Sequence, residues 1–255
     1  VSYFHRPNQH SKTVSDISRY LRQQKERFGE TLYLEEQILR EAELAAHGLA
    51  EEGGTVTEAW NTARTLAQLD EMICNCTKCA LGETRNRFVF GVGNPEADVV
   101  LVGEAPGAEE DKQGEPFVGR AGKLLDKILE AVDFKREDVF ICNILKCRPP
   151  NNRNPLPEEI ESCIPFLERQ IAALAPAVIC TLGAVATRAL LGTDAPISRL
   201  RGRFHDYRGT PVMPTYHPAF LLRHPEKKRE TWGDIQKIMG LMEKNSLLTS
   251  QGKMV

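Results

Sequence analysis

Residues 98–107 read DVVLVGEAPG, and the architecture of the chain follows from this segment. Val99 to Val102 form a continuous apolar run that ends abruptly at Gly103. An apolar run of this length is typical of a strand that is buried on both faces of a parallel sheet. Open α/β sheets bind ligands just beyond the carboxyl ends of such strands, so the loop GEAPG is a candidate binding segment. Taken alone, the pattern also fits an ordinary strand followed by a turn.

Further apolar runs alternate with segments of helical spacing. Strands are predicted at 139–145, 177–182 and 211–215, the last being the second strand of a hairpin that begins near 203. Helices are predicted at 123–132, 157–174, 184–191 and 229–242. This alternation predicts a three-layer α/β/α sandwich around a central, parallel-dominated, four-stranded sheet.

The chain is expected to divide into an N-terminal extension, one main domain and a tail. Residues 1–55 carry apolar positions at helical spacing among many charged residues, which predicts a helical extension broken near Gly29. A helix over 56–73 opens the domain of residues 56–245, and residues 246–255 are predicted to be a loose tail. Nothing in the extension carries chemistry, and it could recruit a replication or repair partner.

Composition excludes several classes of protein. The formal net charge of -2 gives no global signature of nucleic-acid binding, so an anionic partner must meet a local basic patch. No apolar stretch reaches the ~20 residues of a membrane span, and the first residues lack a signal-peptide core. We therefore expect a cytoplasmic protein without membrane contact, and a monomer by default. Disulfides between its seven cysteines are not expected in that reducing compartment.

Polar residues follow three of the predicted strands, namely Glu104, Asn143 and His217. The carboxyl ends of parallel strands meet at one edge of a sheet, so these side chains are expected to converge. Singly, each is weak evidence for a site, because an Asn at a strand end commonly caps a turn and His-Pro commonly marks one.

Four cysteines have a pattern that suits metal binding. Cys76 and Cys79 are two residues apart, Cys147 lies in a Pro-rich loop, and Cys163 lies in a predicted helix. Spacing alone leaves zinc, an iron–sulfur cluster and chance burial of thiols open. The other cysteines are interpreted as non-ligating: Cys74, Cys142 and Cys180.

Six motifs occur together in this chain. They are CTKC (76–79), GEAPGAEED (103–111), GEPFVGRAG (114–122), ICNILKCRPPNNR (141–153), the cysteine at 163 and HPAFLLR (217–223). In this combination the chain resembles the family 4 uracil-DNA glycosylases, the bacterial and archaeal type with a [4Fe–4S] cluster. The resemblance covers about residues 66–242. It implies a DNA repair enzyme that flips uracil out of DNA and hydrolyses its N-glycosidic bond, leaving an abasic site.

The resemblance also implies which thiolates hold the cluster. They are Cys76, Cys79, Cys147 and Cys163. The cluster is expected to be structural and to hold the loop after the second strand rigid against DNA phosphates. The residues of this loop that are expected to contact DNA are Lys146, Arg148, Asn152 and Arg153.

Residues around the flipped base receive roles from the same resemblance. His217 is implied as the donor to the charge that develops on uracil O2. Asn143 is implied to select uracil through paired amide hydrogen bonds, and Phe117 to stack on the base. Glu110 is implied as the guard against the thymine methyl group.

One departure concerns the attacking water. Cluster-free glycosylases of the superfamily have an aspartate where this chain has Ala105, and family 4 members usually have a small residue there. The backbone of Glu104 and Ala105 is expected to line the pocket. Glu104 is the candidate for activating the water, with direct dissociation of the base as the alternative.

Residues 217–229 are interpreted as the loop that probes DNA. Leu221 or Leu222 could fill the gap left by the flipped base, as apolar wedges of minor-groove binders do. Arg223 and the basic residues at 227–229 would hold phosphates, which predicts salt-sensitive binding.

Two alternatives come from the binding class of protein. A relative that traps its product would carry a basic, His-containing insertion, but the loop CRPPNNRNP has no His. A non-catalytic iron–sulfur DNA-binding module of a replication protein would not need the intact Asn143 and His217. Preference for single- or double-stranded DNA stays open.

Overall fold

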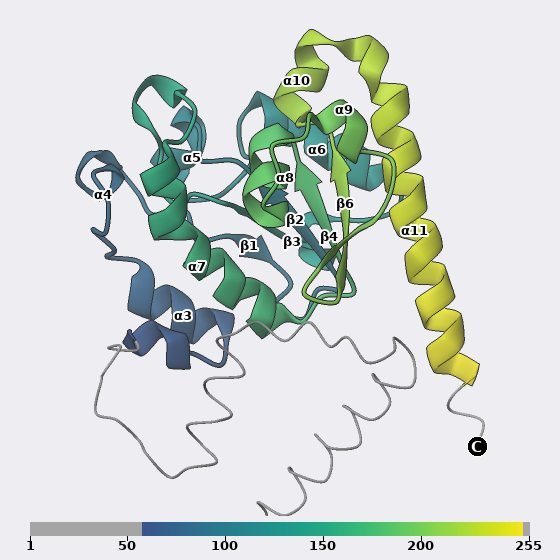
Figure 1. The fold of residues 1–255 in the computed structure, drawn as a ribbon, viewed down its shortest axis with the longest axis horizontal. Helices are drawn as coiled ribbons and strands as arrows, with labels where there is room; N and C mark the ends of the chain where they lie inside the picture. The colour runs from purple at the N-terminus through teal and green to yellow at the C-terminus, as the bar shows by residue number, and fades with distance from the viewer. Residues whose placement is uncertain (1–57, 252–255) are drawn as a thin grey trace, which may run out of the picture. The chain divides into compact units, whose positions relative to one another are not determined.

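A computed structural model describes residues 58–251 of the chain. The helices predicted within residues 1–55, and residues 252–255 of the predicted tail, lie outside the described residues. In the described part, one sheet has helices on both of its faces (Figure 1), which confirms the predicted α/β/α architecture. None of the helices in this part is long and apolar enough to cross a membrane.

The sheet has the order β1-β3-β2-β4-β6-β5, and its four central strands run parallel. Two short antiparallel edge strands, β1 and β5, enlarge the predicted four-stranded sheet to six strands. Every residue of β2 is buried, as expected of a strand covered on both faces. The strands are β1 (Val92–Gly93), β2 (Val99–Gly103), β3 (Phe140–Asn143), β4 (Val178–Leu182), β5 (His205–Tyr207) and β6 (Thr210–Thr215).

The helices depart from the predicted ranges at the two ends of the domain. The helix predicted at 56–73 is broken into η1 (Ala59–Thr62) and α3 (Leu66–Ile73), because the Thr65 hydroxyl caps α3 by accepting from the Gln68 N–H at 3.2 Å. At the other end, α11 (Lys228–Gln251) continues past 242 into the segment predicted to be loose. The remaining helices are α4 (Leu81–Thr84), α5 (Ala108–Gln113), α6 (Arg120–Glu130), η2 (Arg136–Asp138), η3 (Pro150–Asn152), α7 (Pro157–Leu174), α8 (Ala184–Leu191), α9 (Ile197–Leu200), α10 (Pro218–Arg223) and η4 (Pro225–Lys227).

Alternate side chains of the central strand pack into two separate cores. Val100 and Val102 join the core that contains residues of α3, α7 and α8. Val99 and Leu101 join the core that contains residues of α6 and α11. Successive residues of a strand point to opposite faces, so a continuous apolar run is needed to fill both cores.

The four parallel strands end at one edge of the sheet. Gly103 of β2 is the register partner of Asn143 of β3, and Leu182 of β4 is the partner of Thr215 of β6. The loops that leave this edge carry the polar residues expected to converge there.

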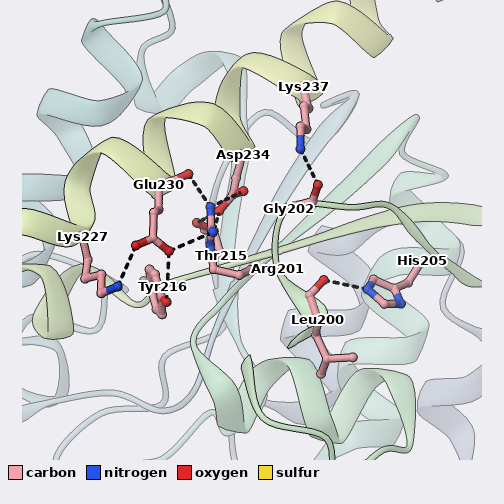
Figure 2. Close-up of polar contacts among 10 residues, drawn as sticks. All are labelled: Leu200, Arg201, Gly202, His205, Thr215, Tyr216, Lys227, Glu230, Asp234 and Lys237. Carbon is pink, nitrogen blue, oxygen red and sulfur yellow. Dashed lines mark hydrogen bonds and ion pairs between the residues drawn. The ribbon is translucent and has the colours of Figure 1, made fainter. Parts of the chain in front are cut away.

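A network of ion pairs and hydrogen bonds fastens the end of β6 to α11 (Figure 2). Arg201 donates to both carboxylate oxygens of Asp234, at 3.0 and 2.6 Å, and to Glu230 Oε2 at 3.0 Å. The Thr215 hydroxyl donates to Asp234 Oδ2 at 2.7 Å. Because His217 follows β6 by two residues, this network fixes where the strand delivers it.

The network can be tested by removing its cation. Arg201→Met leaves the carboxylate of Asp234, which is 1% exposed, buried without its partner. We expect the free energy of unfolding in urea to fall by about 3–5 kcal/mol. The control is Arg203→Met at a nearby exposed arginine, which should change it by less than about 0.5 kcal/mol. Equal losses in both variants would contradict the network's role.

Candidate active site

A cavity of about 450 Å³ opens at the carboxyl edge of the sheet. Its walls come from the loops after β2, β3 and β6 and from α10. A cavity of this size suits a small ligand such as one base. The sequence-predicted site residues that line it are Glu104, Ala105, Glu110, Phe117, Asn143, Asn152, Arg153, His217 and Arg223.

Asn143 brings an unpaired amide oxygen to this cavity. The residue ends β3 and is 2% exposed, and its Oδ1 atom is buried without a hydrogen-bond partner among the described residues. A buried acceptor left unsatisfied costs roughly 1–3 kcal/mol. The unpaired oxygen therefore indicates that a donor from a ligand completes it.

His217 is held as a neutral donor. Its Nδ1 atom accepts a hydrogen bond from the Ala219 N–H at 3.1 Å, so the proton of the neutral ring lies on Nε2. Burial, and then the positive charge of Arg223, lower the pKa of the imidazole to about 4, whereas Glu110 opposes this shift. At neutral pH the ring thus carries an Nε2–H without a positive charge.

Phe117 forms an aromatic wall of the cavity. Its ring lies 5.5 Å from the His217 ring, centroid to centroid, and its backbone φ of 55° is unusual for a residue with a side chain. Arg136 holds this conformation by donating to the carbonyl oxygens of Phe117 and Pro116, at 3.1 and 2.6 Å. Asp126 accepts from the same guanidinium at 2.9 Å. The ring is therefore positioned before any ligand arrives.

Two glutamates lie in the cavity wall with different environments. Glu110 Oε1 accepts from the N–H groups of Val118 and Gly119, at 3.1 and 3.0 Å, which ties α5 to the loop that carries Phe117. Glu104 is half-buried, and this burial raises the pKa of its carboxyl group. A carboxylate with a raised pKa suits general-base work near neutral pH.

Two glycines leave room for the side chains of the site, because each lies where a Cβ atom would overlap a neighbour. A Cβ atom on Gly103 would lie 2.3 Å from Asn143 Oδ1 and 2.6 Å from Phe117 Cζ. On Gly122 it would lie 1.7 Å from the carbonyl oxygen of Phe117. These contacts are far too short, so any larger residue would displace the site.

Most of the residues predicted to contact DNA near the cavity are held by side-chain hydrogen bonds. Arg148 Nε donates to Asn152 Oδ1 at 2.7 Å. Arg153 pairs with both carboxylate oxygens of Glu159, at 2.9 and 2.6 Å. Arg223, on α10, is exposed and lines the cavity.

Two expected DNA contacts are corrected by burial. The prediction for Lys146 is wrong, because it is fully buried and donates to the Asn143 carbonyl at 2.8 Å and to Gln170 Oε1 at 2.5 Å. Leu221 is also fully buried and cannot enter DNA from this position, whereas Leu222 is 39% exposed. Of the two leucines, only Leu222 is placed to act as a wedge.

Two of the four predicted ligand cysteines, Cys147 and Cys163, are buried. Burial raises the pKa of Cys147, Arg85 opposes this shift, and Cys79 and Cys76 add smaller raising effects. Burial raises the pKa of Cys163 to about 12, with smaller raising effects from Cys147 and Cys76. Within residues 58–251, no three His, Cys, Asp or Glu side chains are arranged to hold one metal ion.

Nitrogen donors surround these sulfur atoms. Arg85 Nη1 donates to Cys147 Sγ at 3.5 Å, and the Lys146 N–H donates to Cys163 Sγ at 3.3 Å. The Lys78 N–H donates to Cys76 Sγ at 3.5 Å. Such bonds stabilise negative charge on sulfur, so the donor set suits thiolate ligands.

Comparison with known proteins fits this geometry. The family model described as uracil DNA glycosylase superfamily matches residues 90–236. The type-4 uracil-DNA glycosylase of Archaeoglobus fulgidus is 45% identical over 174 residues, which cover 65% of this chain and 87% of that protein. The type-4 enzyme of Thermotoga maritima is 46% identical over 180 residues, covering 69% and 94%. The chain belongs to the type-4 uracil-DNA glycosylase family.

In this type-4 family member, two residues that shape the site were not predicted from the sequence, namely Phe220 and Arg136. Phe220 lines the cavity and stacks between Tyr216 and His224, with ring centroids at 5.0 and 4.3 Å. The spacing of four residues between these rings is the signal that could have revealed the stack. Arg136 has no comparable signal, because its partners lie some distance away along the chain.

The glycine constraint gives a direct test of the site. Gly103→Ala should displace Asn143 and Phe117 and lower the rate of uracil excision by at least about 100-fold, the scale on which one lost transition-state donor acts. The circular dichroism spectrum of this variant should match that of the folded wild type. Gly240→Ala, where nothing lies within 4 Å of the new methyl group, is the matched control and should keep the full rate. An active Gly103→Ala enzyme would contradict the assigned pocket.

Proposed function

We propose that this chain removes uracil from DNA by hydrolysing its N-glycosidic bond, which leaves an abasic site. The observation that carries the proposal is one cavity that holds both the unpaired Asn143 Oδ1 and the neutral His217. Membership of the type-4 family supports the same activity.

The unpaired oxygen of Asn143 explains a preference for uracil over cytosine. Uracil carries an N3–H donor beside the O4 acceptor, and an amide side chain can accept from the first and donate to the second. Cytosine has no proton on N3, so it would leave Asn143 Oδ1 unpaired. That penalty of roughly 1–3 kcal/mol corresponds to about a 5- to 150-fold preference.

His217 supplies the main stabilisation of the departing base. As the bond between C1′ and N1 breaks, its electron pair leaves with the base and negative charge gathers on O2. A neutral Nε2–H can strengthen its hydrogen bond to O2 as this charge grows. A cationic ring is not needed, and the depressed pKa of His217 disfavours one.

Glu104 is the proposed base for the attacking water. Water adds its oxygen to C1′ of the oxocarbenium-like sugar, and its proton passes to the carboxylate. The raised pKa of Glu104 makes it a better proton acceptor than a fully solvated glutamate. Ala105 supplies backbone and no competing side chain.

Other residues in and around the cavity bind the substrate. Phe117 stacks on the flipped uracil, and Glu110, fixed by two N–H groups, excludes the methyl group of thymine. Leu222 enters the gap in the duplex. The residues proposed to hold DNA around the pocket are Arg148, Asn152, Arg153 and Arg223.

The activity is tested by single-turnover release of uracil from a U:G duplex. We expect free uracil from the wild type and a rate about 10²–10³ lower for His217→Ala. Asn143→Leu should lose rate and also narrow the preference for uracil over cytosine. Asn61→Leu, at an exposed position outside the cavity, serves as the matched control.

Two outcomes would overturn this function. Tight binding of uracil-DNA with no free uracil would assign the chain to product-trapping binders. Binding without any dependence on uracil would assign it to non-catalytic DNA-binding modules.

We also propose that Cys76, Cys79, Cys147 and Cys163 hold a [4Fe–4S] cluster. Four cysteine thiolates are the usual ligand set of such a cluster, and these four residues would supply it. N–H donors to the sulfur atoms of Cys76, Cys147 and Cys163, together with membership of the type-4 family, support this proposal. When bound, the cluster would supply rigidity, because these cysteines lie in the segment around Cys76, in the loop after β3 and in α7.

The ligand set is tested by metal analysis. Serine at any of the four positions should lower the iron and acid-labile sulfide that the purified protein retains. Cys74→Ser should retain the iron and the sulfide, because Cys74 is not a proposed ligand and its thiol donates a hydrogen bond to the Glu71 carbonyl oxygen. Zinc in place of iron in the wild type would contradict the assignment.

A further inference from the structure

A second cavity lies on the other side of α10. Ala219, Phe220 and Arg223 of this helix line the uracil cavity, whereas Leu221 lines the second one. The second cavity has a volume of about 210 Å³ and lies among α6, α10 and α11. Its apolar wall includes Leu124 of α6.

The volume of this second cavity limits the size of the group that can bind in it. An apolar cavity of about 150 Å³ can hold a benzene-sized ring. A volume of about 210 Å³ therefore has room for one larger ring, such as a single nucleobase, and is smaller than a usual site for a drug-sized ligand.

The cavity also contains an unpaired polar atom. Thr231, on α11, is 2% exposed, and its Oγ1 atom is buried without a hydrogen-bond partner among the described residues. A purely apolar occupant would leave this hydroxyl without a partner, as it is among the described residues of the free protein, and would gain no hydrogen bond. A ring with a polar edge would satisfy it.

The rim of the second cavity carries residues of the types that commonly bind nucleotides. Trp232 is 37% exposed, although tryptophan is usually well covered, and offers a ring on which a base can stack. Lys127 of α6 and Lys228 of α11 are exposed on either side of the cavity. Neither lysine forms an ion pair within the described part of the chain, so both ammonium groups are free for phosphate.

We propose that this second cavity binds one unpaired base of the DNA strand that carries the flipped uracil, with Lys127 and Lys228 on its phosphates. The inference rests on the proposed function, because it takes DNA as the ligand. A helix with its side chains is about 10–12 Å across, and stacked nucleotides rise about 3.4 Å each. The bound base is then about three nucleotides from the uracil.

A peptide is the competing occupant. An aromatic side chain flanked by acidic residues would also fit an apolar cavity with a cationic rim. DNA is favoured because Leu221, in the wall of this cavity, is adjacent in sequence to the exposed Leu222 and Arg223 at the proposed DNA face.

The chain offers a built-in probe of this site. It has two tryptophans, Trp60 and Trp232, so Trp60→Phe leaves Trp232 as the single reporter. We expect a uracil-free single-stranded oligonucleotide to quench the fluorescence of Trp232 in the full chain. Trp232→Ala should raise the Kd for this oligonucleotide by about 5- to 150-fold, the range for one stacked base.

Charge and hydroxyl variants complete the test. Lys127→Gln with Lys228→Gln should lower the salt slope of binding by about 1.4, since each phosphate contact on a single strand contributes about 0.7. Lys112→Gln with Lys135→Gln, at lysines already paired with Glu109 and Glu137, is the control and should keep the slope. Thr231→Val, which keeps the shape of the side chain, should raise the Kd.

The outcomes separate this inference from the proposed function. If the wild type releases uracil but Trp232→Ala binds the uracil-free oligonucleotide with the wild-type Kd, only the proposed role of the second cavity is overturned. Quenching by an acidic peptide with one phenylalanine, but not by the oligonucleotide, would make the cavity a protein-docking site and also overturn it. Wild-type enzyme that releases no uracil would overturn the function, whatever the oligonucleotide does.

Discussion

The register that sets Gly103 opposite Asn143 is the constraint on which the pocket depends. Parallel pairing of β2 with β3 brings the amide of Asn143 so near that a single methyl group on Gly103 would overlap it, and the Phe117 ring occupies the same space. A slip of one residue would turn Asn143 to the opposite face of the sheet. The position of Asn143, the residue proposed to recognise the base, is therefore fixed by the hydrogen-bonded sheet.

Two arginines fix other parts of the site by donating hydrogen bonds to the backbone and to a buried carboxylate. Arg136 donates to the carbonyl groups of Phe117 and Pro116. Arg201 holds the carboxylate of Asp234 in α11, and this carboxylate accepts from Thr215 at the end of β6 (Figure 2). Both tie the site to rigid secondary structure. Electrostatic catalysis needs donors that are already oriented when charge develops, because reorienting them during the reaction would raise the barrier. The arrangement around His217 meets this need.

The sequence predicted the features that have a local pattern. The apolar run from Val99 to Val102 identified the central strand, and the rule that parallel strands end at one edge brought Asn143 and His217 together. Other features have no local signature. The pairing of Arg201 with Asp234 spans 33 positions, so no spacing rule predicts it. Lys146 was expected to contact DNA because of the family resemblance, and its burial depends on partners that only the fold brings near.

Lys146 connects Asn143 to the proposed ligand cysteines. Its ammonium group donates to the carbonyl of Asn143, while its own N–H donates to Cys163 Sγ. Cys147 is the next residue along the chain. A buried ammonium needs fixed acceptors, since losing one would leave a charge in an apolar interior. A group that clamps Cys147 and Cys163 would hold this short segment at one end, and the sheet holds it at the other. A structural cluster could in this way contribute to uracil recognition without touching the substrate, by limiting how far Asn143 can move.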